Sequence, residues 1–264
     1  MSAFFAIKAG DRSFMFTDGA GYTADGVIRS FGTKVTVAAT VPLAATSLGN
    51  ADLGERTRTF LLAQAEKFGV DNFLDVFMPS FLAELKETYQ ALPGNRHNNL
   101  MVAMVVWSET RGIQHIGFQT AAEQDRDDIV PFALRDLGNT AMRGPEFPIE
   151  RMSTVRQPLA GESQEQYLRH LGLEVMTFMR QRADVTQNRR GTADEPQFFV
   201  GGHIDLTTVD KAGARIERIH VWPDKIGERI NPFATVETVV PFGNRAQRRA
   251  AGKLHSADFR RRLA

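Results

Sequence analysis

The sequence predicts an α+β fold, in which two mainly antiparallel sheets are flanked by helices as a four-layer αββα sandwich. Two observations predict it. The predicted elements run in the order strands, two helices, strands, one or two helices, strands, which fits a layered sandwich and not a doubly wound parallel sheet. The chain also has 264 residues, 42% hydrophobic and 24% charged, which suffices for one sizeable core.

Short alternating segments predict the first strands. Residues 3–8 and 12–17 flank an Ala-Gly-Asp turn, and Phe14 and Phe16 alternate with smaller or polar neighbours, so we expect a hairpin. Residues 27–31 and 34–49 predict two further strands, the second ending at a Gly-Asn pair.

The periodicity then changes from two to about 3.6 residues. A first helix is predicted over residues 52–68, because its apolar positions lie on one helical face and Gly69 follows as a stop signal. A second is predicted over residues 71–92, with Pro79 expected to kink or break it. Two successive helices after a set of strands indicate a helical layer packed on a sheet.

The second half is predicted by the same criteria. Ser163 and Gln166 have the spacing of a capping box, which marks the start of a helix. The predicted strands are 100–108, 112–119, 197–210 and 215–224, and the predicted helices are 127–137 and 163–182.

Several classes of protein and site are excluded or disfavoured. The chain has no cysteine, which excludes disulfides, thiolate metal sites and cysteine nucleophiles. No apolar run approaches the roughly 18 residues of a membrane helix, and the N-terminal segment is unlike a signal peptide, so we expect a cytoplasmic protein that contacts no membrane. No cofactor is expected. His203, Asp205 and His220 could meet as a metal site across the last hairpin, but we interpret them as polar residues of a strand surface.

Charge is distributed unevenly along the chain. Residues 243–264 hold seven basic residues and one acid, a net charge of +6, so the preceding 1–242 carry −5 within the total of +1. We therefore divide the chain into a domain, 1–242, and a basic C-terminal tail, 243–264. The tail is either a solvated helix or an arm that docks on nucleic acid or on an acidic protein surface.

Three residues near the start of the chain have a spacing that suggests chemistry. Ser2 becomes the N-terminal residue if Met1 is removed, and Asp18 and Lys34 follow sixteen and thirty-two positions later. An N-terminal serine combines a nucleophilic hydroxyl with a base, its own α-amine. Because that amine has a pKa of about 7.7–8.0, a nearby lysine ammonium would help by lowering it. A carboxylate beside the lysine would hold it charged and oriented.

Residues 2–90 resemble the proteasome β-subunits and their bacterial relatives among the N-terminal-nucleophile hydrolases. The likeness is carried by an early strand after Ser2, the turn TDGAG (17–21), the segment GTKVTV (32–37) and the small-residue segment AATSLGN (44–50) before a long helix. It implies the four-layer fold of that superfamily, Ser2 as nucleophile and base, and Lys34 paired with Asp18. It also implies an oxyanion-hole N–H from Gly49, with Ser47 or Leu48 as alternatives because the segment is one residue longer than the family pattern.

Two functions follow as expectations. The first is a peptidase or amidase that cleaves a peptide or amide substrate through Ser2, either as a monomer or as a homo-oligomer. Such an enzyme would use serine as its nucleophile, whereas proteasome β-subunits use threonine. The second is a non-catalytic structural or accessory subunit, in a phage or another assembly, that keeps the fold and docks through its basic tail.

Overall fold

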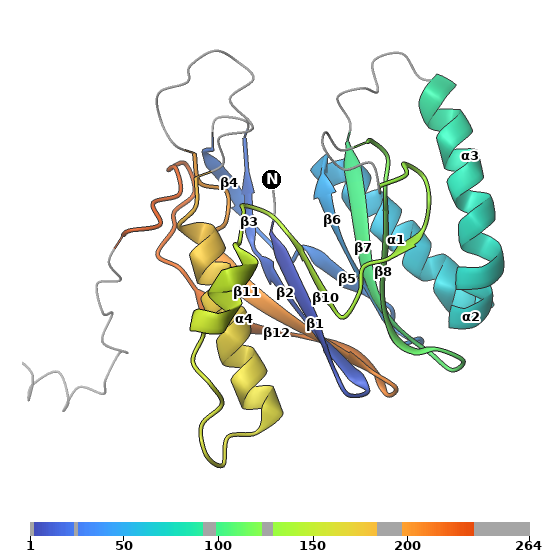
Figure 1. Ribbon diagram of the computed structural model, residues 1–264. Helices are drawn as coiled ribbons and strands as arrows, with labels where there is room; N and C mark the ends of the chain where they lie inside the picture. The colour runs from blue at the N-terminus through green and yellow to red at the C-terminus, as the bar shows by residue number, and fades with distance from the viewer. Residues whose placement is uncertain (1–2, 24–25, 92–98, 123–128, 184–196, 235–264) are drawn as a thin grey trace, which may run out of the picture. The chain divides into compact units, whose positions relative to one another are not determined.

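The chain folds as an α+β protein with three antiparallel sheets. The computed structural model describes residues 3–23, 26–91, 99–122, 129–183 and 197–234 (Figure 1). Residues Met1–Pro232 form one compact unit. Ser2, the predicted domain boundary at residue 242 and the basic tail lie outside the described residues.

The first five-stranded sheet contains strands from both the beginning and the end of this unit's sequence. Its strand order is β10 (Thr140–Arg143), β1 (Phe4–Ala9), β2 (Arg12–Asp18), β11 (His203–Asp210) and β12 (Gly213–Val221). Helix α4 (Gln164–Arg180) packs on one face of it, and the predicted capping box of Ser163 and Gln166 is present. Phe16 of β2 approaches the helix so closely that a Cβ on Gly172 would lie 2.2 Å from its ring. This glycine therefore sets the helix–sheet distance.

The second five-stranded sheet is covered by the other helices. Its order is β5 (Val35–Val37), β6 (Leu43–Gly49), β7 (Leu100–Ser108), β8 (Gly112–Gln119) and β9 (Arg135–Asp136). The helical segments on it are α1 (Ala51–Phe68), α2 (Val70–Asn72), a π-helical turn (Phe73–Phe77) and α3 (Met78–Ala91). Leu61 and Phe73 from the helices and Val102 from the sheet are fully buried in one cluster.

The two large sheets share a third apolar cluster. This cluster exists because successive side chains of a strand point to opposite faces of its sheet. On β2, Phe14 and Phe16 pack in the cluster under α4, and Met15 packs in the cluster between the sheets. The members from the first sheet are Phe4, Ala6, Met15, Ala141 and Val209, and those from the second are Val35, Ala44, Met101, Ala103, Val105 and Ile113. The opposite faces of both sheets carry the helices (Figure 1).

Several details of the secondary structure differ from the sequence prediction. Residues 34–49 are two strands, β5 and β6, because the chain turns back around Pro42, with the Ala38 N–H donating to the Leu43 carbonyl. The helix predicted at 127–137 is absent over the described residues 129–137, where Phe132 has a φ of 59° and β9 pairs with β8. The helix at 163–182 and the other predicted strands are present within three residues of their predicted ends, except that β11 begins at His203 and not at residue 197.

A further difference concerns Pro79. The helix continues past this proline, and the irregularity falls one turn earlier, where the Met78 N–H donates to the Phe73 carbonyl in a π-type bond. A proline ring clashes with the carbonyl four residues before it, and a widened turn relieves that clash without breaking the helix.

The last sheet is small and lies beside the ends of β2 and β11. It consists of β3 (Ala20–Tyr22) and β4 (Ile28–Phe31). Elsewhere in the chain, a 3₁₀ helix covers Ile149–Thr154. Within the described ranges no helix is long and apolar enough to cross a membrane.

Candidate functional site

The strongest site candidate is an ion pair between Asp18 and Lys34. Asp18 ends β2 in the first sheet, and Lys34 immediately precedes β5 in the second. Lys34 Nζ lies 2.8 Å from Asp18 Oδ2, and the two side chains are 16% and 0% exposed. The Tyr22 ring centroid lies 5.6 Å from the same ammonium. The predicted partnership is therefore present in the structure, and the lysine side chain stays partly exposed.

The carboxylate of Asp18 also holds the start of the chain. Its Oδ1 accepts a hydrogen bond of 3.0 Å from the backbone N–H of Ala3, and its Oδ2 accepts one of 3.4 Å from the N–H of Gly201. Ser2 lies outside the described residues, but its carbonyl carbon is bonded to the Ala3 nitrogen. One carboxylate thus contacts the lysine and the peptide group next to the predicted nucleophile.

The segment predicted to supply an oxyanion hole lies at the end of β6. Thr46 Oγ1 donates to the Lys34 carbonyl over 3.1 Å, which ties this end of β6 to Lys34. Gly49 has a φ of 112°, and a Cβ there would lie 1.8 Å from the Asn99 carbonyl oxygen, so only glycine fits the turn into α1. The hydroxyl of Ser47 accepts a hydrogen bond from Arg58 of α1, and the side chain of Leu48 packs in the cluster between the sheets.

Sequence reasoning missed a buried polar cluster at the same end of the sheets. His203 and Asp205, at the start of β11, are 3% and 2% exposed, so their interpretation as polar residues of a strand surface is wrong. His203 Nε2 lies 3.2 Å from Asp205 Oδ2 and 2.9 Å from Arg218 Nη2, and Arg218 Nε donates to Asp205 Oδ1 over 3.1 Å. Thr33, the residue before Lys34, donates its hydroxyl to Asp205 Oδ2 over 2.9 Å.

Burial lowers the pKa of the His203 imidazole; the Asp205 carboxylate opposes that shift and the Arg218 guanidinium adds to it. No group of three or more His, Asp or Glu side chains is placed to hold a metal ion in the part of the chain that the structure describes. His220, the third ligand considered from the sequence, has its ring against Trp222, with the centroids 5.3 Å apart.

A second ion pair fixes the glycine turn at residues 201–202, just before β11. Arg180 and Asp224 are each 3% exposed and form two hydrogen bonds of 2.7 and 2.8 Å. Arg180 also donates to the carbonyls of Val200 and Asn231, and the N–H of Gly202 donates to Asp224 over 2.7 Å. This pair therefore holds the glycine turn whose other side contacts Asp18.

A serine–histidine pair lies at the opposite end of β2. Ser13 Oγ is 2.6 Å from His115 Nε2, and the two residues are 0% and 1% exposed. Burial, followed by the charge of Lys8, lowers the pKa of His115 from 6.5 to about 4. Because a substrate cannot reach either group, we interpret this pair as a polar contact between the two sheets. The residues are 102 positions apart, so no sequence spacing indicates it.

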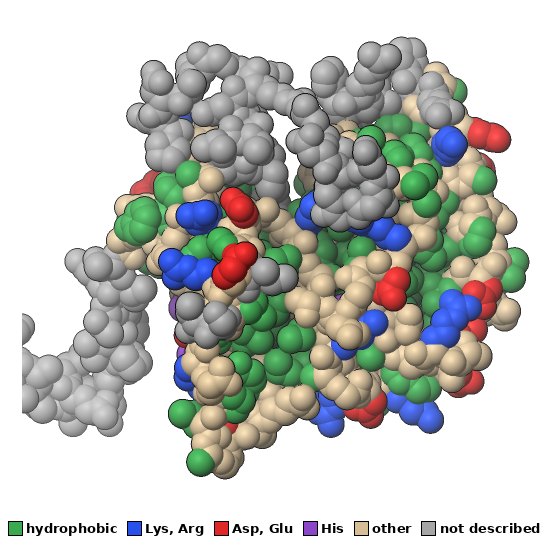
Figure 2. All heavy atoms as spheres, in the orientation of Figure 1, with side chains coloured by type: hydrophobic (Ala, Val, Ile, Leu, Met, Phe, Trp, Pro, Cys, Tyr) green, Lys and Arg blue, Asp and Glu red, His purple; other side chains and the backbone are tan. Residues whose placement is uncertain are grey.

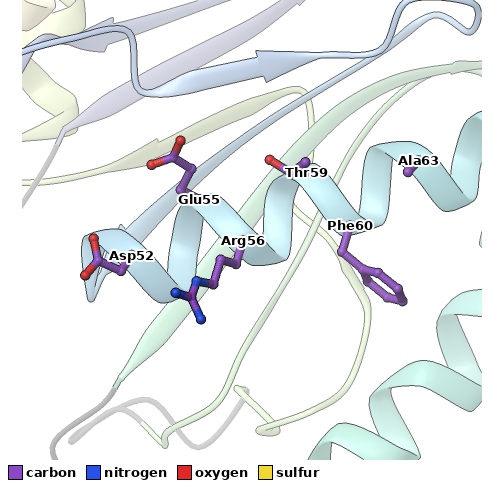
Figure 3. A pocket seen from close by; sticks show the side chains of 6 residues that line it. All are labelled: Asp52, Glu55, Arg56, Thr59, Phe60 and Ala63. Carbon is purple, nitrogen blue, oxygen red and sulfur yellow. The ribbon is translucent and has the colours of Figure 1, made fainter.

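Other surface features lie away from these groups. A pocket runs along α1, and all its lining residues come from that helix: Asp52, Glu55, Arg56, Thr59, Phe60 and Ala63 (Figure 3). None of them contacts the Asp18–Lys34 pair. On the face shown in Figure 2, basic and acidic side chains of the described residues are intermixed.

Comparison with known proteins does not assign the chain to a family. No protein-family model matches it, and no curated protein is significantly similar to it in sequence.

Proposed function

We propose that this protein is an N-terminal serine amide hydrolase, a peptidase or amidase with the four-layer αββα fold of the proteasome-like N-terminal-nucleophile hydrolases. The fold proposal is supported by three apolar clusters, one between the large sheets and one under the helices on each outer face. It is also supported by the antiparallel pairing throughout both sheets.

One observation carries the catalytic proposal. The Asp18 carboxylate contacts both the Lys34 ammonium, at 2.8 Å, and the N–H of Ala3, at 3.0 Å. Ala3 is the residue next to the proposed nucleophile, so the carboxylate orients the lysine beside the place where a free N-terminus would begin. A buried carboxylate needs hydrogen-bond partners, and here one of them is the backbone N–H next to the proposed nucleophile.

The chemistry assigned to each group follows from its type. Once Met1 has been removed, the Ser2 hydroxyl attacks the carbonyl carbon of a peptide or amide, and the Ser2 α-amine accepts the hydroxyl proton. The Lys34 charge lowers the pKa of that amine, so that more of it is unprotonated near neutral pH. The oxyanion of the tetrahedral intermediate takes a hydrogen bond from a backbone N–H at the end of β6, that of Gly49 or of Ser47 or Leu48. The amine then returns the proton to the leaving nitrogen, and water hydrolyses the acyl-enzyme.

The test begins with the intact mass of the protein, expressed with its own N-terminal sequence and no N-terminal tag. We expect loss of one methionine, followed by covalent labelling at Ser2 with a serine-directed electrophile. Ser2→Ala should abolish labelling, whereas Ser13→Ala, which changes a buried serine, should leave labelling at Ser2 unchanged. Retention of Met1 together with no labelling would refute the hydrolase.

That refutation would leave a non-catalytic subunit with the same fold, for which the charge of residues 243–264 is the favouring observation. Such an arm binds through electrostatics that are screened by salt. Deletion of the residues after Phe242 should then abolish salt-sensitive binding to an acidic polymer such as heparin. It should leave the melting temperature within about 2 °C, because the buried clusters are built from residues before 232.

A further inference from the structure

The cluster of His203, Asp205 and Arg218 connects the two halves of the Asp18–Lys34 pair by a second route. On one side the His203 ring packs against Gly19, which directly follows Asp18, and a Cβ on Gly19 would lie 2.1 Å from that ring. On the other side Asp205 accepts the hydroxyl of Thr33, which directly precedes Lys34. The two routes form a closed ring across the ends of both sheets.

The backbone around Lys34 is fixed at three successive residues. The N–H of Gly32 donates to the carbonyl of Gly19 over 2.9 Å, Thr33 Oγ1 donates to Asp205, and the Lys34 carbonyl accepts from Thr46. Only the Thr33 bond reaches across to β11 of the first sheet through a side chain. Removing it would leave this segment attached to Gly19 and to β6 but not to Asp205, so Lys34 would lose one of the contacts that fix its backbone beside Asp18.

Asp205 suits this task because its geometry is itself fixed. The carboxylate is almost completely buried and has three polar partners, which are Thr33, Arg218 and His203. A buried charged group with several hydrogen bonds has little freedom to rotate. Asp205 therefore provides a rigid reference point.

We infer that Asp205 is a positioning residue that, through the Thr33 hydroxyl, sets the place of the Lys34 ammonium relative to Asp18 and to the N-terminus. As a role in catalysis the inference rests on the proposed function. The position of Lys34 does not depend on that function. The positioning role of Asp205 and the proposed function can therefore be refuted separately.

The test compares three conservative variants. Thr33→Val removes the hydroxyl and keeps the side-chain shape, and Thr33→Ser retains the hydroxyl. Thr207→Val is the matched control, since Thr207 is a fully buried threonine on the same strand as Asp205 whose hydroxyl has no hydrogen-bond partner among the described residues.

The first measurement is the rate of Lys34 acetylation by acetic anhydride, followed by mass spectrometry and referred to the exposed Lys86 and Lys225 of the same molecule. We expect Thr33→Val to raise the relative rate at Lys34 at least about threefold, because a looser ion pair exposes the amine more often. Thr33→Ser and Thr207→Val should match the wild type. An unchanged rate in Thr33→Val would overturn the inference, whatever happens at Ser2.

The second measurement is the pH dependence of electrophile labelling at Ser2. Thr33→Val should slow labelling by roughly tenfold and move its midpoint to higher pH, because a displaced Lys34 no longer lowers the pKa of the α-amine as strongly. A variant that labels with the wild-type rate and midpoint contradicts the inference. Absence of labelling in the wild type refutes the proposed function, and the Lys34 rate still decides the role of Asp205.

Discussion

Acidification should destabilise this protein through His115. The imidazole is buried between the two sheets, where burial, followed by the charge of Lys8, lowers its pKa from 6.5 to about 4. In the unfolded chain the same group titrates near 6.5. Between these two values the unfolded state binds more protons than the native state, so the stability falls as the pH falls through this window.

The size of the effect follows from the two pKa values. Linkage between protonation and folding gives a loss of about 2 kcal/mol at pH 5 and about 3 kcal/mol at pH 4 relative to pH 7. Burial also lowers the pKa of His203 and of His220, so both add to the loss in the same direction. The contribution of His115 must therefore be isolated by a variant.

The assay is urea denaturation at pH 7 and pH 5 for the wild type and for His115→Gln, which keeps a polar group toward Ser13 but does not titrate. The variant should lose about 2 kcal/mol less than the wild type between the two pH values. His170→Gln, at a partly exposed position on α4, is the control. Equal losses in the wild type and His115→Gln would show that His115 does not titrate with a lowered pKa in the native state. An NMR titration of the wild-type imidazole tests the same pKa directly, even if the variant folds poorly.

Three further predictions concern the site. Lys34→Ala should slow electrophile labelling at Ser2 by roughly 10²–10⁴-fold while the secondary structure measured by circular dichroism is retained. Gly19→Ala should lower the unfolding free energy by about 1–3 kcal/mol in denaturant titrations, because its Cβ would overlap the buried His203 ring, whereas Gly32→Ala, with open space around it, should cost much less. Asp224→Asn breaks a buried ion pair and should cost about 3–5 kcal/mol, measured as a lower urea midpoint; a loss below about 1 kcal/mol would contradict that role.

Much of the local structure could be predicted from the sequence. The capping box at Ser163, the stop at Gly69 and the alternation of Phe14 and Phe16 are signals between residues a few positions apart, and the structure contains all three features. The Asp18–Lys34 pair was predicted from a family-like spacing, and the structure contains it as well. The roles of Ser2, Asp18, Lys34 and Gly49 in catalysis stay predictions.

The rest depended on contacts that no local pattern contains. His203 and Asp205 alternate with Ile204 and Leu206, which indicates a strand with one polar face, and only packing against the other sheet buries that face. Tertiary contacts also explain why the helix predicted at 127–137 is absent from the described residues 129–137. Pairing with β8 favours an extended Arg135–Asp136 over the helix that the local periodicity predicts.

Most element types and their order could be predicted from the sequence, and the charge of the tail and the spacing of Asp18 and Lys34 are read directly from it. The polar pairs between the sheets, Thr33 with Asp205 and Ser13 with His115, depend on how the sheets pack. Periodicity in the sequence records only which face of an element is apolar. The partner of a buried polar group is decided by how two sheets pack, and that brings together residues 102 and 172 positions apart.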